Sequence, residues 1–292
     1  VKMASLKDIK RHISAVKQTQ KLTKAMNMVA AAKLRAVQNR TELFRYYADE
    51  HKRLVNEIGT RAKEVNHPLL KPNPKAEKAL VLAFTSDRGL CGSFNANVFH
   101  KLDHKIVDLR EEGVRPELFI VGRKGYDYYR RRRIFLKESV VGELGTFDYE
   151  QALEISKKLS DYYNLGEYRE IFVCHTCFRS LTKHEVTIDQ LMPLVPEDVD
   201  HSISSKLDYL IEPNPTDLLS RLIPRSLDIM IYRAFLESVT SENAARMQAM
   251  DNASKSCKDI IVSLTMAYNK ARQAAVTNEL LDIVNGAEAL KG

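Results

Sequence analysis

The stretch KLTKAMNMVAAAKLRAVQ, from Lys21 to Gln38, has the composition of a thin, positively charged helix. Most of its residues have high helix propensity, its apolar side chains are mostly small, and all its charges are positive. A helix that closes an ordinary core carries bulkier apolar residues on one face and mixed charges on the other. The composition therefore raises the question of what this helix contacts.

The helix-forming region extends outward from this stretch, because no glycine or proline interrupts the chain from Val1 to Ile58. A second such window runs from Arg225 to Asn285. All nine prolines and nine of the eleven glycines lie between Gly59 and Pro224. At 1.5 Å per residue, each window is long enough for a helix of about 80–90 Å. A helix of that length needs a partner along most of its extent.

Both windows carry the alternating spacing of three and four residues that is typical of a coiled coil. The first follows Leu6, Ile9, Ile13, Val16, Gln20, Thr23, Asn27, Ala30, Leu34, Val37, Thr41, Phe44, Ala48, His51, Val55 and Ile58. The second follows Met250, Ala253, Cys257, Ile260, Leu264, Ala267, Ala271, Ala274, Asn278 and Leu281. A strict heptad repeat predicts left-handed supercoiling, and the many alanines predict closely spaced helices. Two unrelated surface helices are the alternative.

The middle of the chain has a different pattern, in which short apolar runs alternate with helical segments. Strands are expected at 78–86, 117–122, 169–177 and 183–194, and helices at 95–112 and 149–163. Such alternation predicts a small, mostly parallel α/β sheet. The sequence thus divides into an N-terminal coiled-coil helix (1–66), a central α/β domain (67–208) and a C-terminal coiled-coil helix (209–292).

Charge is unevenly distributed along the 292 residues. The net charge is +7, yet residues 1–41 alone hold ten Lys or Arg and one acidic residue, Asp8. Nucleic acid, an anionic membrane surface and an acidic protein are all possible partners of this segment. No run approaches the ~18 apolar residues of a membrane span, and residues 1–14 lack the apolar core of a secretory signal. Four cysteines do not make a disulfide framework in a chain of this length.

Two motifs in the middle are candidates for chemistry. TSDRGLCGSFN, from Thr85 to Asn95, follows a strand and precedes a helix, where phosphate-binding loops lie, but it matches neither nucleotide-binding glycine pattern. A tight turn that uses Gly89 and Gly92 is the preferred interpretation. CHTC, from Cys174 to Cys177, has redox spacing but lies in a strand pattern. Its two thiols should therefore point to opposite faces and be structural.

Two further segments carry weaker signals. HKLDH, from His100 to His104, places two imidazoles four residues apart, but no third metal ligand can be named, so a solvated helix face is favoured. RKGYDYYRRRR, from Arg123 to Arg133, interleaves tyrosines with cations and could bind nucleic acid or an acidic protein. No nucleophile–base pair is recognisable. We therefore expect a non-enzyme without catalytic, cofactor-binding or metal-binding residues.

Three blocks of the sequence carry a specific resemblance. They are LKDIKRHISAVKQTQKLTKAMNMVAAAKLR (6–35), TSDRGLCGSFN (85–95) and the long block that runs from Glu242 to Leu290. Together they closely resemble the gamma subunit of the F-type ATP synthase, and the likeness spans nearly the whole chain. The resemblance implies an antiparallel left-handed coiled coil of the terminal helices plus a central Rossmann-like, mostly parallel α/β domain.

The resemblance also implies a rotary motor. Such a shaft stands inside a ring of three alpha and three beta subunits and contacts the epsilon subunit and the membrane c-ring at its foot. It couples c-ring rotation and hydrogen ion transport to ATP synthesis or hydrolysis at the beta subunits. The family's contacts map onto Lys24, Met26, Lys33 and Arg35 for an acidic beta segment, onto Arg272, Gln273, Thr277 and Glu279 for a beta loop, and onto Tyr209 and Glu212 for epsilon and the c-ring.

The residues from 191 to 213 lack the cysteine-containing insertion of chloroplast relatives, which favours a bacterial origin. The expected location is the cytoplasmic face of the bacterial plasma membrane, as a peripheral part of the catalytic core complex. The matrix side of the mitochondrial inner membrane is the alternative, and membrane association is expected only through the complex. No nucleic-acid partner is expected. Two other classes stay open: a basic coiled-coil protein that binds nucleic acid, and a small α/β enzyme that uses the loop at 85–95.

Overall fold

A computed structural model describes residues 6–61, 67–132, 134–142, 147–194, 212 and 214–289. The chain forms two compact units. The first contains residues 1–31 and 246–292, and the second contains residues 32–245. Two long helices each contribute to both units: α1 (Leu6–Arg61) and α5 (Pro215–Ala289). The sequence predicted both helices from the two long windows that lack glycine and proline.

Helix α5 begins ten residues earlier than the proline-free window suggested. It starts at Pro215, where the missing N–H of proline costs nothing, and it continues through Pro224. A proline inside a helix removes one backbone hydrogen bond and costs about 3 kcal/mol. Leu219, Ile223 and Leu227 of this first part are nevertheless buried in the core of the second unit. Their burial offsets the cost of the interrupted helix.

In the first unit, α1 and α5 run antiparallel. The Asn27 side chain donates a hydrogen bond from Nδ2 to the Met247 carbonyl at 2.8 Å, and the Gln20 side chain donates from Nε2 to the Ser254 carbonyl at 3.4 Å. Residue numbers thus fall by seven along α1 while they rise by seven along α5. Gln20 and Asn27, two polar residues at predicted coiled-coil positions, thus bind backbone carbonyls of the opposite helix, which helps to fix the register.

The coiled-coil positions predicted for the first helix are confirmed. Each of the sixteen residues from Leu6 to Ile58 is buried or half-buried, whereas the cations between them are mostly exposed. Ala30, Leu34 and Ala48 are among the most deeply buried. A narrow stripe with small side chains is therefore what α1 turns toward its neighbours in both units.

The positions predicted for the second helix are only partly right. Met250, Ala253 and Cys257 are covered, as are Leu264 and Ala271. The others are exposed, namely Ile260, Ala267, Ala274, Asn278 and Leu281, and the half-buried side chains are instead Ile261, Tyr268 and Ala275. The covered residues keep the seven-residue spacing, because 254, 261, 268 and 275 alternate with 250, 257, 264 and 271. The prediction placed every second position of the stripe one residue too early.

The second unit is built on a five-stranded sheet with the order β3-β2-β1-β4-β5. Its strands are β1 (Lys78–Phe84), β2 (Arg115–Val121), β3 (Leu136–Val140), β4 (Glu170–Phe178) and β5 (His184–Met192). All neighbours pair in parallel except β4 and β5, which are antiparallel. The mostly parallel α/β domain is therefore confirmed.

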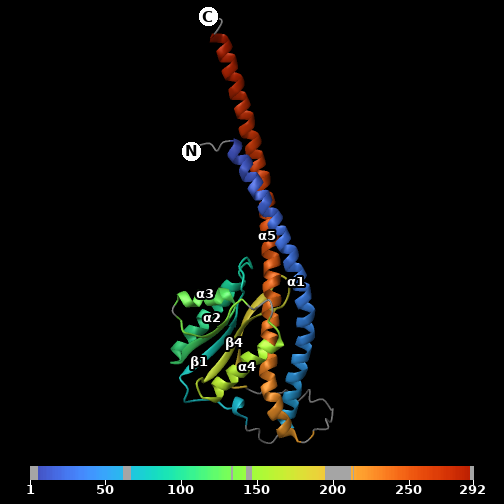
Figure 1. Ribbon diagram of the computed structural model, residues 1–292, viewed down its shortest axis with the longest axis vertical. Helices are drawn as coiled ribbons and strands as arrows, with labels where there is room; N and C mark the ends of the chain where they lie inside the picture. The colour runs from blue at the N-terminus through green and yellow to red at the C-terminus, as the bar shows by residue number, and fades with distance from the viewer. Residues whose placement is uncertain are drawn as a thin grey trace. The chain divides into compact units, whose positions relative to one another are not determined.

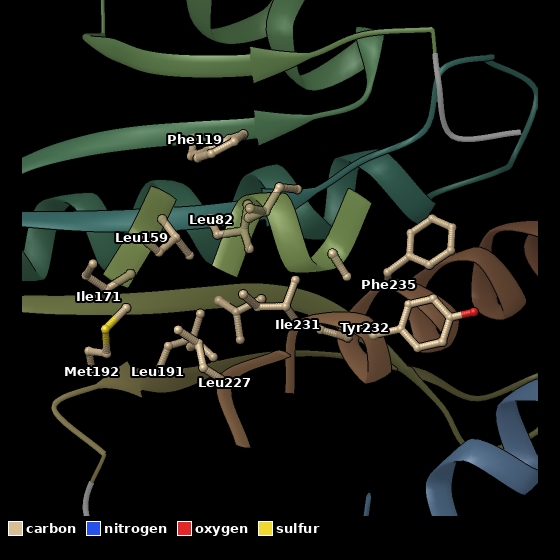
Figure 2. Packing of buried hydrophobic residues seen from close by; sticks show 14 of the residues in the cluster. Leu82, Phe119, Leu159, Ile171, Leu191, Met192, Leu227, Ile231, Tyr232 and Phe235 are labelled. Atoms are coloured by element: carbon tan, nitrogen blue, oxygen red, sulfur yellow. The ribbon is translucent and has the colours of Figure 1, made fainter. Parts of the chain in front are cut away.

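Two apolar layers cover the sheet. Helices α2 (Phe94–Glu111) and α3 (Arg123–Arg131) pack on one face, and α4 (Tyr149–Asn164) with the first part of α5 packs on the other (Figure 1). A short 3-10 helix, η1 (Pro68–Leu70), contributes Leu69 to the second layer. Figure 2 shows Leu227, Ile231 and Phe235 of α5 beside Leu82 and Ile171 of the strands. The long C-terminal helix is thus part of the domain core.

Besides the short helix η1, two elements were not expected from the sequence, α3 and β3. Helix α3 forms within the basic tyrosine-rich segment, where Tyr129 is fully buried and the cations are exposed. Strand β3 lies at the sheet edge and has only half-buried or exposed side chains, including Lys137 and Glu138. Charged residues on an edge strand weaken the apolar alternation by which strands are recognised.

Candidate functional site

The candidate site is the exposed surface of the two terminal helices. In the first unit, Lys7, Lys10, Arg11, Lys17, Lys21 and Lys24 of α1 are all exposed. Met26 is half-buried, whereas its neighbours Met28 and Val29 are exposed by 59% and 58%. The surface around the predicted contact residue Lys24 is therefore cationic with exposed apolar side chains between the charges.

A pocket of about 460 Å³ lies on this surface. It is lined by Gln20, Lys21, Lys24, Asn27, Met28, Asp251 and Ser254. Two lysines line the α1 side of the pocket. On the α5 side, Asp251 Oδ2 forms an ion pair with Lys255 Nζ at 2.6 Å. The local charge is therefore positive, which favours an acidic partner over a basic one.

The C-terminal part of α5 is bare. Every side chain from Val276 to Gly286 is exposed, including Val276, Leu280, Leu281, Ile283 and Val284 at 50–67%. If the register set by Gln20 and Ser254 is extended by fourteen residues, Leu6 of α1 falls opposite Tyr268, which is half-buried. Large apolar side chains beyond that point require another surface to cover them in water.

Sequence reasoning missed this bare apolar end, because it extended the coiled-coil pattern to Leu281. No signal in the sequence indicated it, because the two windows that lack glycine and proline, 1–58 and 225–285, are nearly equal in length. The predicted contact residues Arg272, Gln273, Thr277 and Glu279 are all exposed here. The Thr277 hydroxyl donates to the Gln273 carbonyl at 2.9 Å, a bond within the helix that leaves the surrounding surface open.

The other predicted contact residues belong to the second unit. Lys33 and Arg35 are exposed on α1, and Glu212 is exposed just before α5. Tyr209 lies outside the described residues. The structure thus brings the predicted residues together in separate groups, one on each terminal helix and Glu212 near the start of α5, rather than in one cleft.

A buried network holds α1, α5 and the sheet together in the second unit. Arg45 donates to the Glu237 carboxylate at 2.6 Å and to the Phe178 carbonyl at 3.2 Å, and the same carboxylate accepts from the Phe178 N–H at 2.8 Å. The hydroxyls of Thr41 and Thr240 are 2.8 Å apart. Glu237 is 3% exposed, so these partners rather than water compensate its charge. Sequence reasoning gave no sign of this network.

Polar groups of the loop at Thr85–Asn95 form hydrogen bonds with one another. The Ser86 N–H donates to Asn95 Oδ1 at 3.0 Å, and Asn95 Nδ2 donates to the Ser86 hydroxyl at 2.7 Å. Gly92 has the positive φ expected of a tight turn (58°), but Gly89 does not, and Leu90 adopts φ 63° instead. This geometry favours the structural interpretation of the loop over a phosphate-binding one.

The two cysteines of CHTC lie on opposite faces of β4, as predicted from the odd spacing. Cys174 is buried among the side chains of the α2 layer, and burial raises the pKa of its thiol to about 12. The Cys177 Sγ lies 3.4 Å from His175 Nε2, and burial also raises its pKa. Both thiols are free and protonated at neutral pH, which fits structural cysteines.

The fold and the surface together define a class of protein: two long helices with a basic, partly apolar outer surface, parts of which pack in the core of an α/β domain. The ATP synthase family model matches residues 5–290. The ATP synthase gamma chain of Syntrophobacter fumaroxidans is 40% identical over 291 residues, which cover 99% of this chain and 100% of the relative. The gamma chain of Desulfosudis oleivorans is 41% identical over 298 residues, with the same coverage.

Among solved structures, a chain of the Euglena gracilis mitochondrial ATP synthase (OSCP, F1 and c-ring, rotational state 3) has a TM-score of 0.67 at 17% identity. The match covers 98% of this chain and 94% of that chain. The chain belongs to the family of ATP synthase gamma chains. The relatives give no support to the nucleic-acid-binding alternative. Among the described helices, none has a segment long and apolar enough to cross a membrane.

Proposed function

We propose that this chain is the central rotor shaft of a proton-translocating F-type ATP synthase. In that role the terminal helices stand inside a ring of three alpha and three beta subunits, and the α/β domain is the foot that meets epsilon and the c-ring. The observation that carries the proposal is the bare apolar end of α5, from Val276 to Gly286. Such a surface suits a helix enclosed by an apolar sleeve of other subunits.

The charge on α1 supports the same role. Lys24, Lys33 and Arg35 are exposed, and Met26 is half-buried beside them. Cations that keep water around them attract an acidic beta segment without a rigid ion-pair lock, because exposed pairs contribute only about 0–1 kcal/mol. A moving contact needs attraction of this weak, non-directional kind. We assign these four residues to the contact with beta.

The remaining contacts follow from position on the chain. Arg272, Gln273, Thr277 and Glu279 are exposed just before and within the bare end of α5, and we assign them to a second contact with beta. Glu212 precedes α5 on the domain side, and we assign it, with Tyr209, to epsilon and the c-ring. The chain itself carries no active site in this proposal, and ATP is made or hydrolysed at beta.

Transmission of torque requires that the shaft does not turn against its foot. Arg45, Glu237 and Phe178 link α1, α5 and β4 through four hydrogen bonds, and Arg233 of α5 adds an ion pair to Asp49 of α1 at 2.7 Å. Together with the apolar core, these contacts make the helices and the sheet one body within the second unit. We propose a peripheral location on the cytoplasmic face of a bacterial plasma membrane, reached only through the complex.

The proposal is tested by assembly and rotation. The chain is co-expressed with alpha and beta subunits, and a cysteine introduced at the exposed Glu112 is used to attach a bead. We expect a complex with three alpha and three beta subunits per chain, in which the bead rotates in one direction when ATP is supplied. Failure of the chain to co-purify with alpha and beta, or ATP hydrolysis with a stationary bead, would contradict the rotor function.

A further inference from the structure

We propose that His100 and His104 form a two-ligand site for a divalent cation of the zinc class on the outer face of α2. Both side chains are exposed, and neither contributes to the core or to the surfaces assigned above. The site is independent of the rotor function, because it needs only the folded α/β domain.

The distance between the two imidazoles carries the inference. The Nε2 atoms of His100 and His104 are 3.3 Å apart, and the ring centroids are separated by 4.5 Å. Two nitrogens that bind Zn²⁺ at 2.0–2.1 Å with tetrahedral angles lie about 3.3 Å apart, whereas a right angle at the metal would bring them to about 2.9 Å. The observed spacing therefore matches a tetrahedral chelate.

The helix holds this arrangement in place. Residues four apart lie one above the other on a helix face, and the opposite face of α2 is fixed by the buried side chains of Val98, Leu102 and Ile106. The backbone that positions both imidazoles is thus already ordered by the core. Binding of a cation here costs only the conformational entropy of two exposed side chains, which favours chelation by both histidines over binding to a single one.

The neighbouring charges leave room for a cation. The Lys105 ammonium lies 4.1 Å from the centre of the Phe172 ring, against the sheet side of the helix. Asp103 accepts hydrogen bonds from Tyr128, Tyr129 and Arg132, so its carboxylate is engaged elsewhere. Among the described residues, no three His, Cys, Asp or Glu side chains are grouped for metal binding. Water must therefore complete the coordination, and the affinity is that of a two-ligand site.

The same spacing also fits a plain hydrogen bond between the two rings, so the experiment must detect chelation itself. Zn²⁺ is titrated into the reduced full-length chain by calorimetry in a non-chelating buffer. The variants are H100Q, H104Q, the double variant, and H12Q as a control at an exposed histidine of α1. Far-UV circular dichroism checks that each variant folds, and all of them keep the same four cysteines.

We expect one binding event that either single substitution removes as completely as the double substitution, while H12Q retains it. Zn²⁺ should also raise the melting temperature of wild type and H12Q but not of the other variants, because a ligand that binds only the folded state stabilises it. Zn²⁺ binding that survives in the double variant, additive losses in the two single variants, or an equal loss in H12Q would each overturn the site.

Discussion

Asn27 and Gln20 show what a single polar residue does between the two terminal helices. At coiled-coil positions they replace apolar side chains, and each donates an amide hydrogen bond to a backbone carbonyl of α5. A polar residue at such a position specifies register at some cost in stability. Because each donor is half-buried, its removal deletes one of the hydrogen bonds that specify the register of the two helices.

We therefore expect Asn27→Ala to lower the free energy of unfolding relative to Asn39→Ala. Asn39 is exposed on the same helix, so it corrects for the higher helix propensity of alanine. The difference should be about 1 kcal/mol, the net contribution of one intramolecular hydrogen bond. Urea unfolding of both variants, followed by far-UV circular dichroism, measures it. Equal midpoints and slopes would show that the amide does not hold the register.

The buried side chain of His175 should make the free energy of unfolding depend on pH. The side chain is 6% exposed, and burial lowers its pKa, although the carboxylates of Asp189 and Glu237 oppose this shift and Arg233 adds to it. The folded chain therefore keeps His175 neutral at a pH where the unfolded chain, with a histidine pKa of about 6.5, binds a proton. The unfolding free energy should fall as the pH drops below about 6.5.

The substitution His175→Gln tests this sign. It should reduce the slope of unfolding free energy against pH between pH 7 and pH 5, whatever it does to stability at pH 7. Denaturant unfolding at several pH values gives the slope directly. A slope as steep as that of wild type would mean that His175 is not the group whose protonation is linked to unfolding.

At the scale of elements, the attachment of α1 to α5 and β4 depends on one buried carboxylate. Glu237 is 3% exposed and Arg45 is about one-third exposed. Removal of the arginine side chain therefore leaves the buried Glu237 carboxylate without its ion-pair partner. Removal of one partner of a fully buried pair costs about 3–5 kcal/mol, and the exposure of Arg45 lowers this expectation to about 2 kcal/mol.

We expect Arg45→Ala to lower the free energy of unfolding by about 2 kcal/mol. Arg53→Ala is the matched control: Arg53 lies on the same helix and pairs with Glu50 and Glu57, but it is 48% exposed, so its loss should cost less than about 1 kcal/mol. Chemical denaturation monitored by tyrosine fluorescence measures both. Similar losses in the two variants would show that the Arg45–Glu237 pair behaves as an ordinary surface pair.

The spacing of apolar residues in the sequence predicted most helices and strands, but it did not predict all the contacts between them. The sixteen positions of α1 were right because each apolar residue meets a partner along the whole helix. On α5 the predicted positions Leu264 and Ala271 were right, but Ile260, Ala267 and Ala274 were one residue too early. The sequence also did not show where the partner helix ends. Strand β3 was missed because an edge strand with alternating charges carries little apolar signal.

At the scale of the whole molecule, the exposed polar residues near the end of α5 should affect ATP turnover by the assembled complex rather than folding of the chain. Arg272 and Gln273 are exposed, and their backbone lies within a continuous helix. We expect Arg272→Ala and Gln273→Leu to reduce ATP turnover of the assembled complex while the melting temperature of the isolated chain stays within a few degrees of wild type.

Lys258→Ala is the control for these substitutions. Lys258 is exposed on α5, outside the groups assigned to beta, and its loss should leave turnover unchanged. ATP hydrolysis is measured on complexes whose subunit composition has been verified by gel electrophoresis. Normal turnover in Arg272→Ala and Gln273→Leu complexes of correct composition would remove these residues from the coupling surface.

The sequence by itself determined the two long helices, most strand and helix segments of the middle, the positive charge of residues 1–41 and the family to which the chain belongs. These follow from local properties: helix propensity, the absence of glycine and proline, the spacing of apolar residues and the charge of short segments. Only the tertiary structure decided the rest, namely the register of α1 on α5, the Arg45–Glu237–Phe178 network, the bare end of α5 and the 3.3 Å separation of His100 and His104. Each of these depends on which residues meet across large sequence separations or on how two side chains are rotated, and local patterns do not encode either.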